Sequence, residues 1–278
     1  MTVKKVEPEP TRAAGRPKAA ESIELPTEKS KVSDNLGDYS ILLYGREKIG
    51  KTTLCAQFPD PLFLMFEPGA KAVSVYQLGM DSWVTFKNTI AALRAAPKRF
   101  QTIVIDTIDV AYKFCEEYVC KKLGIDHPSD EEWAKGWTMV RDELTRSLAK
   151  LAATGRGLIF LSHEADRSIK RRKGTEETRI VPSMANGARR VIEPMVDIWA
   201  YYFHDPDGHR KIRIVGDDLV SAGHRLIENF QGIEEIDAGG SPADAYQNFI
   251  AAFGNQSPVA ARPKGLKAKT KIENESEN

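Results

Sequence analysis

Apolar and polar residues follow two different periods along the middle of the chain. Short runs of apolar, often β-branched residues are typical of buried strands, and they occupy residues 39–44, 61–66, 102–106 and 157–161. Apolar residues at helical spacing predict helices between these runs, at residues 53–58, 86–96, 108–123 and 131–153. Further on, residues 196–203 and 210–215 flank the turn sequence Asp205-Pro206-Asp207-Gly208, which is typical of a β-hairpin.

This alternation of strands and helices predicts an α/β fold. We expect a mainly parallel, twisted sheet with helices on both faces, extended by an antiparallel hairpin toward the C-terminus. The chain has 278 residues and 41% hydrophobic content, which is enough to form the core of one such domain.

The two ends of the chain differ from the middle in composition. Residues 1–36 are rich in Pro, Glu, Lys, Ala and Ser, and residues 254–278 are charged and show no periodicity. Such segments bury too little apolar surface to offset chain entropy, so both are predicted to be disordered tails. The folded domain is expected over residues 37–253.

The three cysteines, Cys55, Cys115 and Cys120, form no C-x-x-C pair and have no histidine at zinc-finger spacing. No apolar stretch has the length of a signal-peptide core or of a membrane-spanning helix. We therefore expect a cytoplasmic protein with reduced thiols and no membrane contact. The net charge of +1 excludes no class of partner, because the position of the charges matters more than their sum.

The residues after the first apolar run carry the clearest chemical signal. Residues 45–52 read G-x-x-x-x-G-K-T between a predicted strand and a predicted helix, which is the context of a phosphate-binding P-loop. Backbone N–H groups at such a helix start bind phosphate oxygens. Lys51 would neutralise the β- and γ-phosphates of ATP, and the Thr52 hydroxyl would hold Mg²⁺. The predicted ATP-binding residues are Gly45, Arg46, Glu47, Lys48, Ile49, Gly50, Lys51, Thr52 and Thr53.

Two carboxylates end apolar strands at the edge where ligands bind in open α/β sheets. Asp106 ends the strand 102–106, where a carboxylate can hold the Mg²⁺ that bridges the phosphates. Glu67 ends the strand after the P-loop helix, where a carboxylate can orient a water molecule for attack on the γ-phosphate. A solvated loop glutamate is the alternative. Thr107 and Asp109 are further candidates, although Asp109 also fits the first turn of a helix, where a negative charge is favourable.

The segment 63–72, with Gly79-Met80-Asp81 downstream, resembles the second nucleotide-site segment of RecA-type recombinases. Together with the P-loop, the Asp106 strand and residues 161–164, it is similar to the phage RecA-like P-loop ATPases of the Sak single-strand annealing group, over roughly residues 39–232. The resemblance implies a RecA-like core in which Glu67 activates the attacking water. It also implies that His163 takes the place of the polar residue, often glutamine, that senses the γ-phosphate. A structural histidine is the alternative.

A run of basic residues follows His163, with five of them in the segment 167–173. RecA-type proteins use the mobile segment after the sensor strand to grip single-stranded DNA, so the resemblance implies a basic DNA-binding loop here. Lys and Arg supply sequence-independent affinity through phosphate contacts. The predicted DNA-binding residues are Arg167, Lys170, Arg171, Arg172, Lys173, Arg179, Arg189 and Arg190. A solvated surface run is the alternative.

The sequence departs from the RecA-type pattern where a neighbouring subunit contributes basic residues to each site. Residues 215–219 read Val-Gly-Asp-Asp-Leu, which is acidic where lysines are expected. Nearby candidates for a trans-acting role are Arg210, Lys211, Arg213 and Arg225. Filament assembly and strand exchange are therefore left open, and so is the choice between a monomer and a homo-oligomer.

We expect a P-loop ATPase that uses ATP and Mg²⁺, is stimulated by DNA, binds single-stranded DNA and promotes strand annealing or homologous recombination. Its implied partners are single-stranded DNA and a cognate single-strand DNA-binding protein. Two alternatives remain. One is a P-loop kinase in which residues 170–173 close as a lid, and the other is a nucleotide-gated loader or adaptor for replication proteins. Glu67 disfavours the kinase, because a carboxylate that activates water would waste ATP.

Overall fold

The computed structural model describes residues 25–29, 31–69, 73–96, 99–131, 134–170 and 176–254. The chain divides into two units, Met1–Val32 and Ser33–Asn278. The described residues of the first unit contain no helix or strand, and every element named below lies in the second unit.

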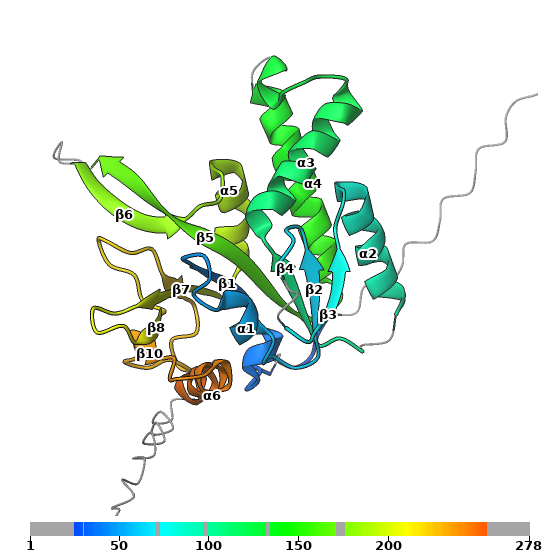
Figure 1. The fold of residues 1–278 in the computed structure, drawn as a ribbon. Coiled ribbons are helices and arrows are strands. Elements are labelled where there is room, and N and C mark those ends of the chain that lie inside the picture. Colours follow the sequence, from blue (N-terminus) through cyan, green and yellow to red (C-terminus); the bar gives the residue numbers. More distant parts are fainter. Residues whose placement is uncertain are drawn as a thin grey trace, which may run out of the picture. The chain divides into compact units, whose positions relative to one another are not determined.

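The second unit is built on a mixed sheet whose central strands are parallel (Figure 1). Its strands are β1 Ser40–Gly45, β2 Pro61–Met65, β3 Tyr76–Gly79, β4 Thr102–Asp106, β5 Gly157–Lys170, β6 Glu176–Pro182, β7 Ile198–His204, β8 Arg210–Arg213, β9 Gly223–His224 and β10 Glu235–Asp237. Their order is β10-β8-β7-β1-β5-β4-β2-β3, with β6 beside β5 and β9 beside β7. The strands from β7 to β3 run parallel, whereas β8 pairs antiparallel with β7 and β10.

Helices cover both faces of this sheet (Figure 1). They are α1 Lys51–Cys55, α2 Trp83–Ala95, α3 Ile108–Leu123, α4 Lys135–Ala152, α5 Asn186–Met195 and α6 Pro242–Phe253. Successive strand residues point to opposite faces: Leu42 and Ile105 pack in the cluster that contains α2 to α5, whereas Leu43 and Val104 pack in the cluster that contains α1 and α6. The predicted α/β architecture, with antiparallel strands toward the C-terminus, is confirmed.

Three helices begin at positions that the apolar pattern does not mark. α1 spans Lys51–Cys55 and not residues 53–58, with Gly50 as its N-terminal capping residue. α2 begins at Trp83 and not at residue 86, because Ser82 caps it by accepting a hydrogen bond from the Thr85 N–H at 3.1 Å. α4 begins at Lys135 and not at residue 131, because a 3₁₀ turn at Pro128–Asp130 comes before it. α3 spans the predicted residues.

The largest difference between prediction and structure lies in β5. The apolar pattern ends this strand at residue 161, and the resemblance to RecA-type proteins implies a mobile DNA-binding loop over the basic segment. In the structure β5 continues to Lys170 and pairs antiparallel with β6, from Glu164 opposite Pro182 to Lys170 opposite Glu176. The resulting hairpin extends beyond the sheet (Figure 1). The loop prediction is therefore wrong for residues up to 170, because a partner strand completes the hydrogen-bond ladder.

The folded unit also begins earlier than predicted. Leu36, assigned above to a tail, is only 2% exposed. Asn35 caps the 3₁₀ turn Leu36–Asp38, since its side-chain oxygen accepts a hydrogen bond from the Gly37 N–H at 3.0 Å. Residues 1–24 and 255–278 of the two predicted tails lie outside the described residues.

Candidate nucleotide site

The loop between β1 and α1 has the backbone that a P-loop requires. Gly50 has a φ of 111°, a conformation that other residues rarely adopt. A Cβ atom on Gly45 would lie 2.1 Å from the carbonyl oxygen of Tyr202, so β1 can end against β7 only with a glycine. Lys51 turns back over the loop, and its Nζ donates hydrogen bonds to the carbonyls of Gly45 and Arg46, both at 2.8 Å. These contacts hold the ammonium group over the loop that would bind phosphate.

The register of the parallel strands brings the other predicted residues to the same edge. Gly45 of β1 pairs with His163 of β5, and Asp106 of β4 pairs with Met65 of β2, the strand that Glu67 follows. The carboxyl ends of these four strands therefore meet beside the P-loop, where ligands bind in open α/β sheets.

Thr52 and Asp106 form the pair expected at a magnesium site. Thr52 Oγ1 donates a hydrogen bond to Asp106 Oδ2 at 3.0 Å. Hydroxyl and carboxylate oxygens are hard donors of the kind that Mg²⁺ binds, usually together with water and substrate phosphates. These residues fit the ion and would hold it, and the bound ion would neutralise charge on the phosphate oxygens.

Glu67 lies at the same edge within reach of two polar side chains. Thr107 Oγ1 donates a hydrogen bond to Glu67 Oε1 at 2.6 Å, and His163 Nε2 lies 3.7 Å from Glu67 Oε2. The other ring nitrogen of His163 lies 3.5 Å from Lys51 Nζ. The Glu67 side chain is 37% exposed, so water can reach it. The structure therefore brings Glu67, His163 and Lys51 together and adds Thr107 as the residue that orients the carboxylate.

Burial changes the pKa values of two charged groups in this site. Lys51 is 7% exposed, and burial lowers the pKa of its ammonium group, although the nearby charge of Asp106 opposes the shift. Burial also raises the pKa of the Asp106 carboxyl, and the hydrogen bond from Thr52 opposes that change. Charges in such a poorly solvated place interact more strongly than in water, which favours binding of a metal–phosphate complex.

Three contacts around the P-loop were missed by the reasoning from sequence. Arg210 Nε donates a hydrogen bond to the Ile49 carbonyl at 3.1 Å. Arg46 pairs with Glu164 at 3.0 Å, and the Tyr201 hydroxyl donates to the same carboxylate at 2.9 Å. The P-loop residues and their partners lie more than 100 positions apart in the chain. They meet only because β5, β7 and β8 lie on the two sides of β1.

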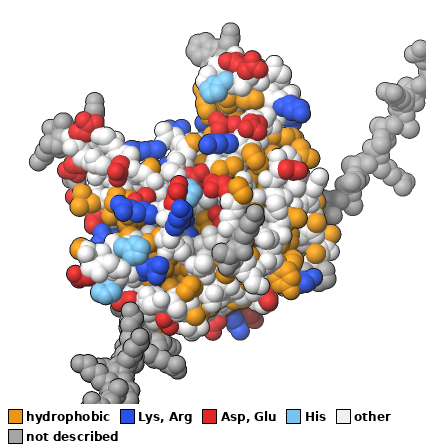
Figure 2. All heavy atoms as spheres, in the orientation of Figure 1, with side chains coloured by type: hydrophobic (Ala, Val, Ile, Leu, Met, Phe, Trp, Pro, Cys, Tyr) orange, Lys and Arg blue, Asp and Glu red, His pale blue; other side chains and the backbone are white. Residues whose placement is uncertain are grey.

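The first group of predicted DNA-binding residues lies along the β5–β6 hairpin. Arg167 is in β5, and its Nη1 donates a hydrogen bond to Asn186 Oδ1 at the start of α5, at 2.7 Å. Lys170 is the last residue of β5. Three further residues lie outside the described residues, namely Arg171, Arg172 and Lys173. Figure 2 shows Lys and Arg side chains gathered between the hairpin and strands β7 and β8, with Asp and Glu side chains among them.

The other three predicted DNA-binding residues differ in how far they are engaged within the protein. Arg179 Nη2 donates hydrogen bonds to the backbone carbonyls of Asp217 and Val220, at 2.5 and 3.2 Å. Arg189 forms an ion pair with a glutamate of the same helix at 2.5 Å. Arg190 is exposed on α5. Arg179 thus has a structural role in joining the hairpin to a neighbouring loop.

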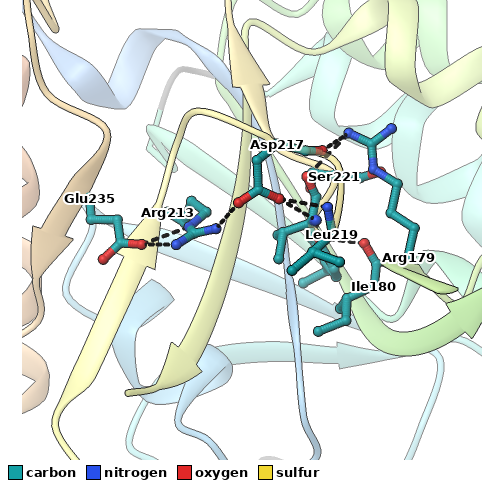
Figure 3. A network of polar contacts seen from close by, with 9 residues as sticks. Arg179, Ile180, Arg213, Asp217, Leu219, Ser221 and Glu235 are labelled. Atoms are coloured by element: carbon teal, nitrogen blue, oxygen red, sulfur yellow. Dashed lines mark hydrogen bonds and ion pairs between the residues drawn. The ribbon is translucent and has the colours of Figure 1, made fainter. Parts of the chain in front are cut away.

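Residues 215–219 belong to the loop that Arg179 contacts, and the contacts of Asp217 explain why an acidic residue stands there (Figure 3). Asp217 accepts hydrogen bonds from two backbone N–H groups of its own loop, at 2.8 and 2.7 Å, and from Arg213 Nη1 at 2.7 Å. The loop then pairs with β6: the Ile180 N–H donates to the Leu219 carbonyl at 2.7 Å, and the Ser221 N–H donates to the Ile180 carbonyl at 3.0 Å. A lysine at position 217 could not accept these hydrogen bonds, so the acidic residue supports the hairpin.

The four candidates for a trans-acting cation each have a partner within their own chain. Arg210 contacts the P-loop and Arg213 contacts the acidic loop. Lys211 pairs with an aspartate of β10 at 2.9 Å, and Arg225 donates a hydrogen bond to a backbone carbonyl of α5 at 2.7 Å. These side chains therefore take part in the fold of a single chain.

The cysteines and one cluster of possible metal ligands have a plain structural account. The three cysteines are buried and unpaired. Asp205, Asp207 and His209 cluster in the β7–β8 turn. The Asp205 carboxylate, however, already accepts hydrogen bonds from the backbone N–H groups of Asp207 and His209, at 3.0 and 2.8 Å. Among the described residues, no helix combines the length and the apolar character needed to cross a membrane.

Comparison with known proteins agrees with this geometry. A family model described as "AAA domain" matches residues 38–226, more than half of the chain. A curated relative, the SPbeta prophage-derived uncharacterized protein YorG of Bacillus subtilis (strain 168), is 29% identical over 174 residues, which cover 60% of this chain and 50% of the relative. The chain thus spans about half the length of that relative. Because the family match includes the P-loop and the strands that carry Glu67, Asp106 and His163, this chain belongs to the AAA domain family.

Proposed function

We propose that this chain is an ATPase that couples hydrolysis to the binding of single-stranded DNA, in strand annealing or homologous recombination. The position of Glu67 is the observation that carries the hydrolytic part. Its carboxylate is oriented by the Thr107 hydroxyl at 2.6 Å and lies at the strand end next to Asp106, partly open to solvent. A carboxylate held in this way can accept a proton from an attacking water molecule.

The other residues of the site have distinct roles in this reaction. Lys51 and the backbone of residues 45–52 bind the phosphates of ATP, and Thr52 with Asp106 holds Mg²⁺. His163 lies between Glu67 and Lys51, within 3.7 Å of the first and 3.5 Å of the second. A ring N–H at this position can donate a hydrogen bond to the γ-phosphate and so distinguish ATP from ADP.

The position of the hairpin supports the DNA-binding part. β5 carries His163 at the nucleotide site and continues without a break to Lys170 in the hairpin. A change at the γ-phosphate can therefore be transmitted along one strand to the basic segment. Lys and Arg side chains there would contact the DNA backbone, which gives salt-sensitive binding without base specificity.

Two further statements belong to the same proposal. The prophage source of the similar Bacillus protein supports a phage role, in keeping with the resemblance to the Sak annealing group. A cognate single-strand DNA-binding protein is the proposed protein partner. Self-association remains part of the proposal as well, with residues other than Arg210, Lys211, Arg213 and Arg225 completing a neighbouring site.

The test measures ATP hydrolysis and DNA binding in the full chain and in two triple-alanine variants. One variant replaces Arg171, Arg172 and Lys173, and the matched control replaces the exposed residues Lys121, Lys122 and Lys150 on α3 and α4. The first should bind all single-stranded sequences more weakly, with a salt slope flatter by about 0.7 for each lost phosphate contact. Its DNA-stimulated hydrolysis should fall, while basal hydrolysis and the control variant stay near wild type.

Other outcomes separate the alternatives. A wild-type protein that hydrolyses ATP equally with and without DNA would contradict the proposal. Stimulation by a protein partner alone would support the loader, and phosphate transfer to an acceptor molecule would support the kinase. The course of β5 disfavours the kinase lid, because this strand runs from the site into a hairpin that extends beyond the sheet (Figure 1).

A further inference from the structure

The carboxylate of Asp109 joins three elements at the base of the hairpin. Asp109 lies in the first turn of α3, and its Oδ1 accepts hydrogen bonds from the hydroxyls of Ser162 at 3.1 Å and Ser183 at 2.5 Å. Ser162 is on β5, directly before His163, and Ser183 directly follows β6. One side chain thus connects α3, the strand that carries His163 and the second strand of the hairpin.

A backbone hydrogen bond reinforces the same junction. The N–H of Ser183 donates to the carbonyl of His163 at 2.9 Å. Ser183 is therefore attached both to the backbone of His163 and to the side chain of Asp109. Asp109 lies in α3, whose N-terminal capping residue is Thr107, directly after Asp106. Both contacts end next to residues of the nucleotide site.

The burial of Ser162 and of one carboxylate oxygen of Asp109 argues against a purely local role for Asp109. Ser162 is 0% exposed, and Asp109 Oδ2 is buried without a hydrogen-bond partner among the described residues. Burial also raises the pKa of the Asp109 carboxyl. A carboxylate that served only the helix dipole would be better placed in water, because burying an unpaired polar atom is unfavourable. The buried position of the Asp109 carboxylate is explained if this side chain is needed where α3, β5 and β6 meet.

We propose that Asp109 is a positioning residue that couples the β5–β6 hairpin to the nucleotide site through Ser162 and Ser183. A displacement of β6 moves Ser183. The backbone hydrogen bond of Ser183 transmits this movement to His163, and its hydroxyl transmits it to α3 through Asp109. Because coupling between two sites is reciprocal, nucleotide at the P-loop changes the hairpin by the same route. The inference rests on the proposed function, in which the hairpin binds DNA.

The central test variant is Ser183→Ala, because Ser183 is exposed and its hydroxyl can be removed without opening the core. Ser183→Thr keeps a hydroxyl and should rescue the effect. Ser168→Ala is the matched control, since the Ser168 hydroxyl bonds Glu176 across the hairpin and does not reach Asp109. All variants are made in the full chain, and their thermal unfolding is compared with wild type.

The first readout is hydrogen–deuterium exchange of the hairpin amides with and without a non-hydrolysable ATP analogue and Mg²⁺. The analogue should slow exchange in wild type, Ser168→Ala and Ser183→Thr, and most of this protection should be lost in Ser183→Ala although the analogue still binds. The second readout is the effect of the analogue on single-stranded DNA affinity, which should shrink about fivefold in Ser183→Ala, the lower end of typical coupling. The Asp109→Asn, Ser183→Ala double variant should lose no more coupling than the larger single loss.

Two results would overturn the inference: an unchanged hairpin response in Ser183→Ala, or a wild-type hairpin that does not respond to nucleotide. Failure of the proposed function looks different. A protein that binds no DNA loses that function, yet the exchange experiment still reports whether Ser183 and Asp109 connect the nucleotide site to the hairpin.

Discussion

Replacing Glu67 by glutamine tests its proposed catalytic role with the smallest change in shape. The Glu67→Gln side chain has the same length, and its amide oxygen can still accept the hydrogen bond that Thr107 donates at 2.6 Å. It cannot accept a proton from water. Nucleotide binding should therefore persist, because Lys51 and the P-loop backbone are unchanged. The rate of ATP turnover should fall, because the attacking water loses its general base.

The expected fall in turnover of Glu67→Gln can be calculated from the contribution of a general base. A positioned general base contributes at least about a hundredfold to a rate, and a hundredfold loss corresponds to ~2.7 kcal/mol of activation free energy. The contact of Glu67 with His163, at 3.7 Å, is too long for a strong hydrogen bond, so its loss should change nucleotide affinity little. A fall in turnover with nearly unchanged affinity is the signature of a group that acts in the transition state.

The assay combines phosphate release at saturating ATP with a titration of a fluorescent ATP analogue. The control is Glu164→Gln, which removes the same charge from a carboxylate that contacts Arg46 and Tyr201. Glu164→Gln should retain far more activity than Glu67→Gln. Turnover near wild type in Glu67→Gln would refute the assignment, and so would an equal loss in both variants, since it would show a general effect of charge.

Three further predictions concern the surroundings of the site. Asp217→Ala should lower the free energy of unfolding by about 1–2 kcal/mol in urea titrations, because two backbone N–H groups and Arg213 lose their acceptor on a half-exposed side chain. Burial alone would raise the pKa of Asp217, but the backbone hydrogen bonds hold it below its ordinary value; this contribution is therefore present above pH ~4 and lost as the pH falls through the folded pKa. A stability difference that persists unchanged in acid would contradict this account. Arg210→Ala should weaken nucleotide binding about fivefold, because the Ile49 carbonyl loses its donor. Lys211→Ala, on the opposite face of β8, should leave nucleotide binding unchanged in the same titration.

Much of the fold could be predicted from the chain because its local patterns are strong. The apolar runs that became β1, β2 and β4 are flanked by turn residues, and α3 was predicted with its observed bounds. The P-loop was recognisable for a similar reason: its glycines and Lys51 are neighbours in sequence, and their chemistry depends on local backbone. The strand ends at Glu67 and Asp106 could be placed at one edge because parallel strands share it.

The long hairpin was not predictable in the same way. Residues 164–170 contain too many charged side chains to read as a strand. They are extended because β6 pairs with them and because the loop of Asp217 supports β6 from its other side. β6 is close to β5 in the chain, but the loop of Asp217 follows β8, so it reaches β6 only when β7 and β8 have taken their places in the sheet.

The sequence by itself determined the central strands β1, β2 and β4 and the helix α3, and it determined the phosphate-binding chemistry of residues 45–52, because both depend on neighbours along the chain. It did not mark α5 and α6, which also pack in the core. Only the tertiary structure decided that Arg210 reaches the P-loop, that Thr107 orients Glu67, and that Asp109 meets Ser183. These contacts depend on the order of strands in the sheet and on where each strand ends. That order is set by the packing free energy of the whole core, which no single segment of the chain determines.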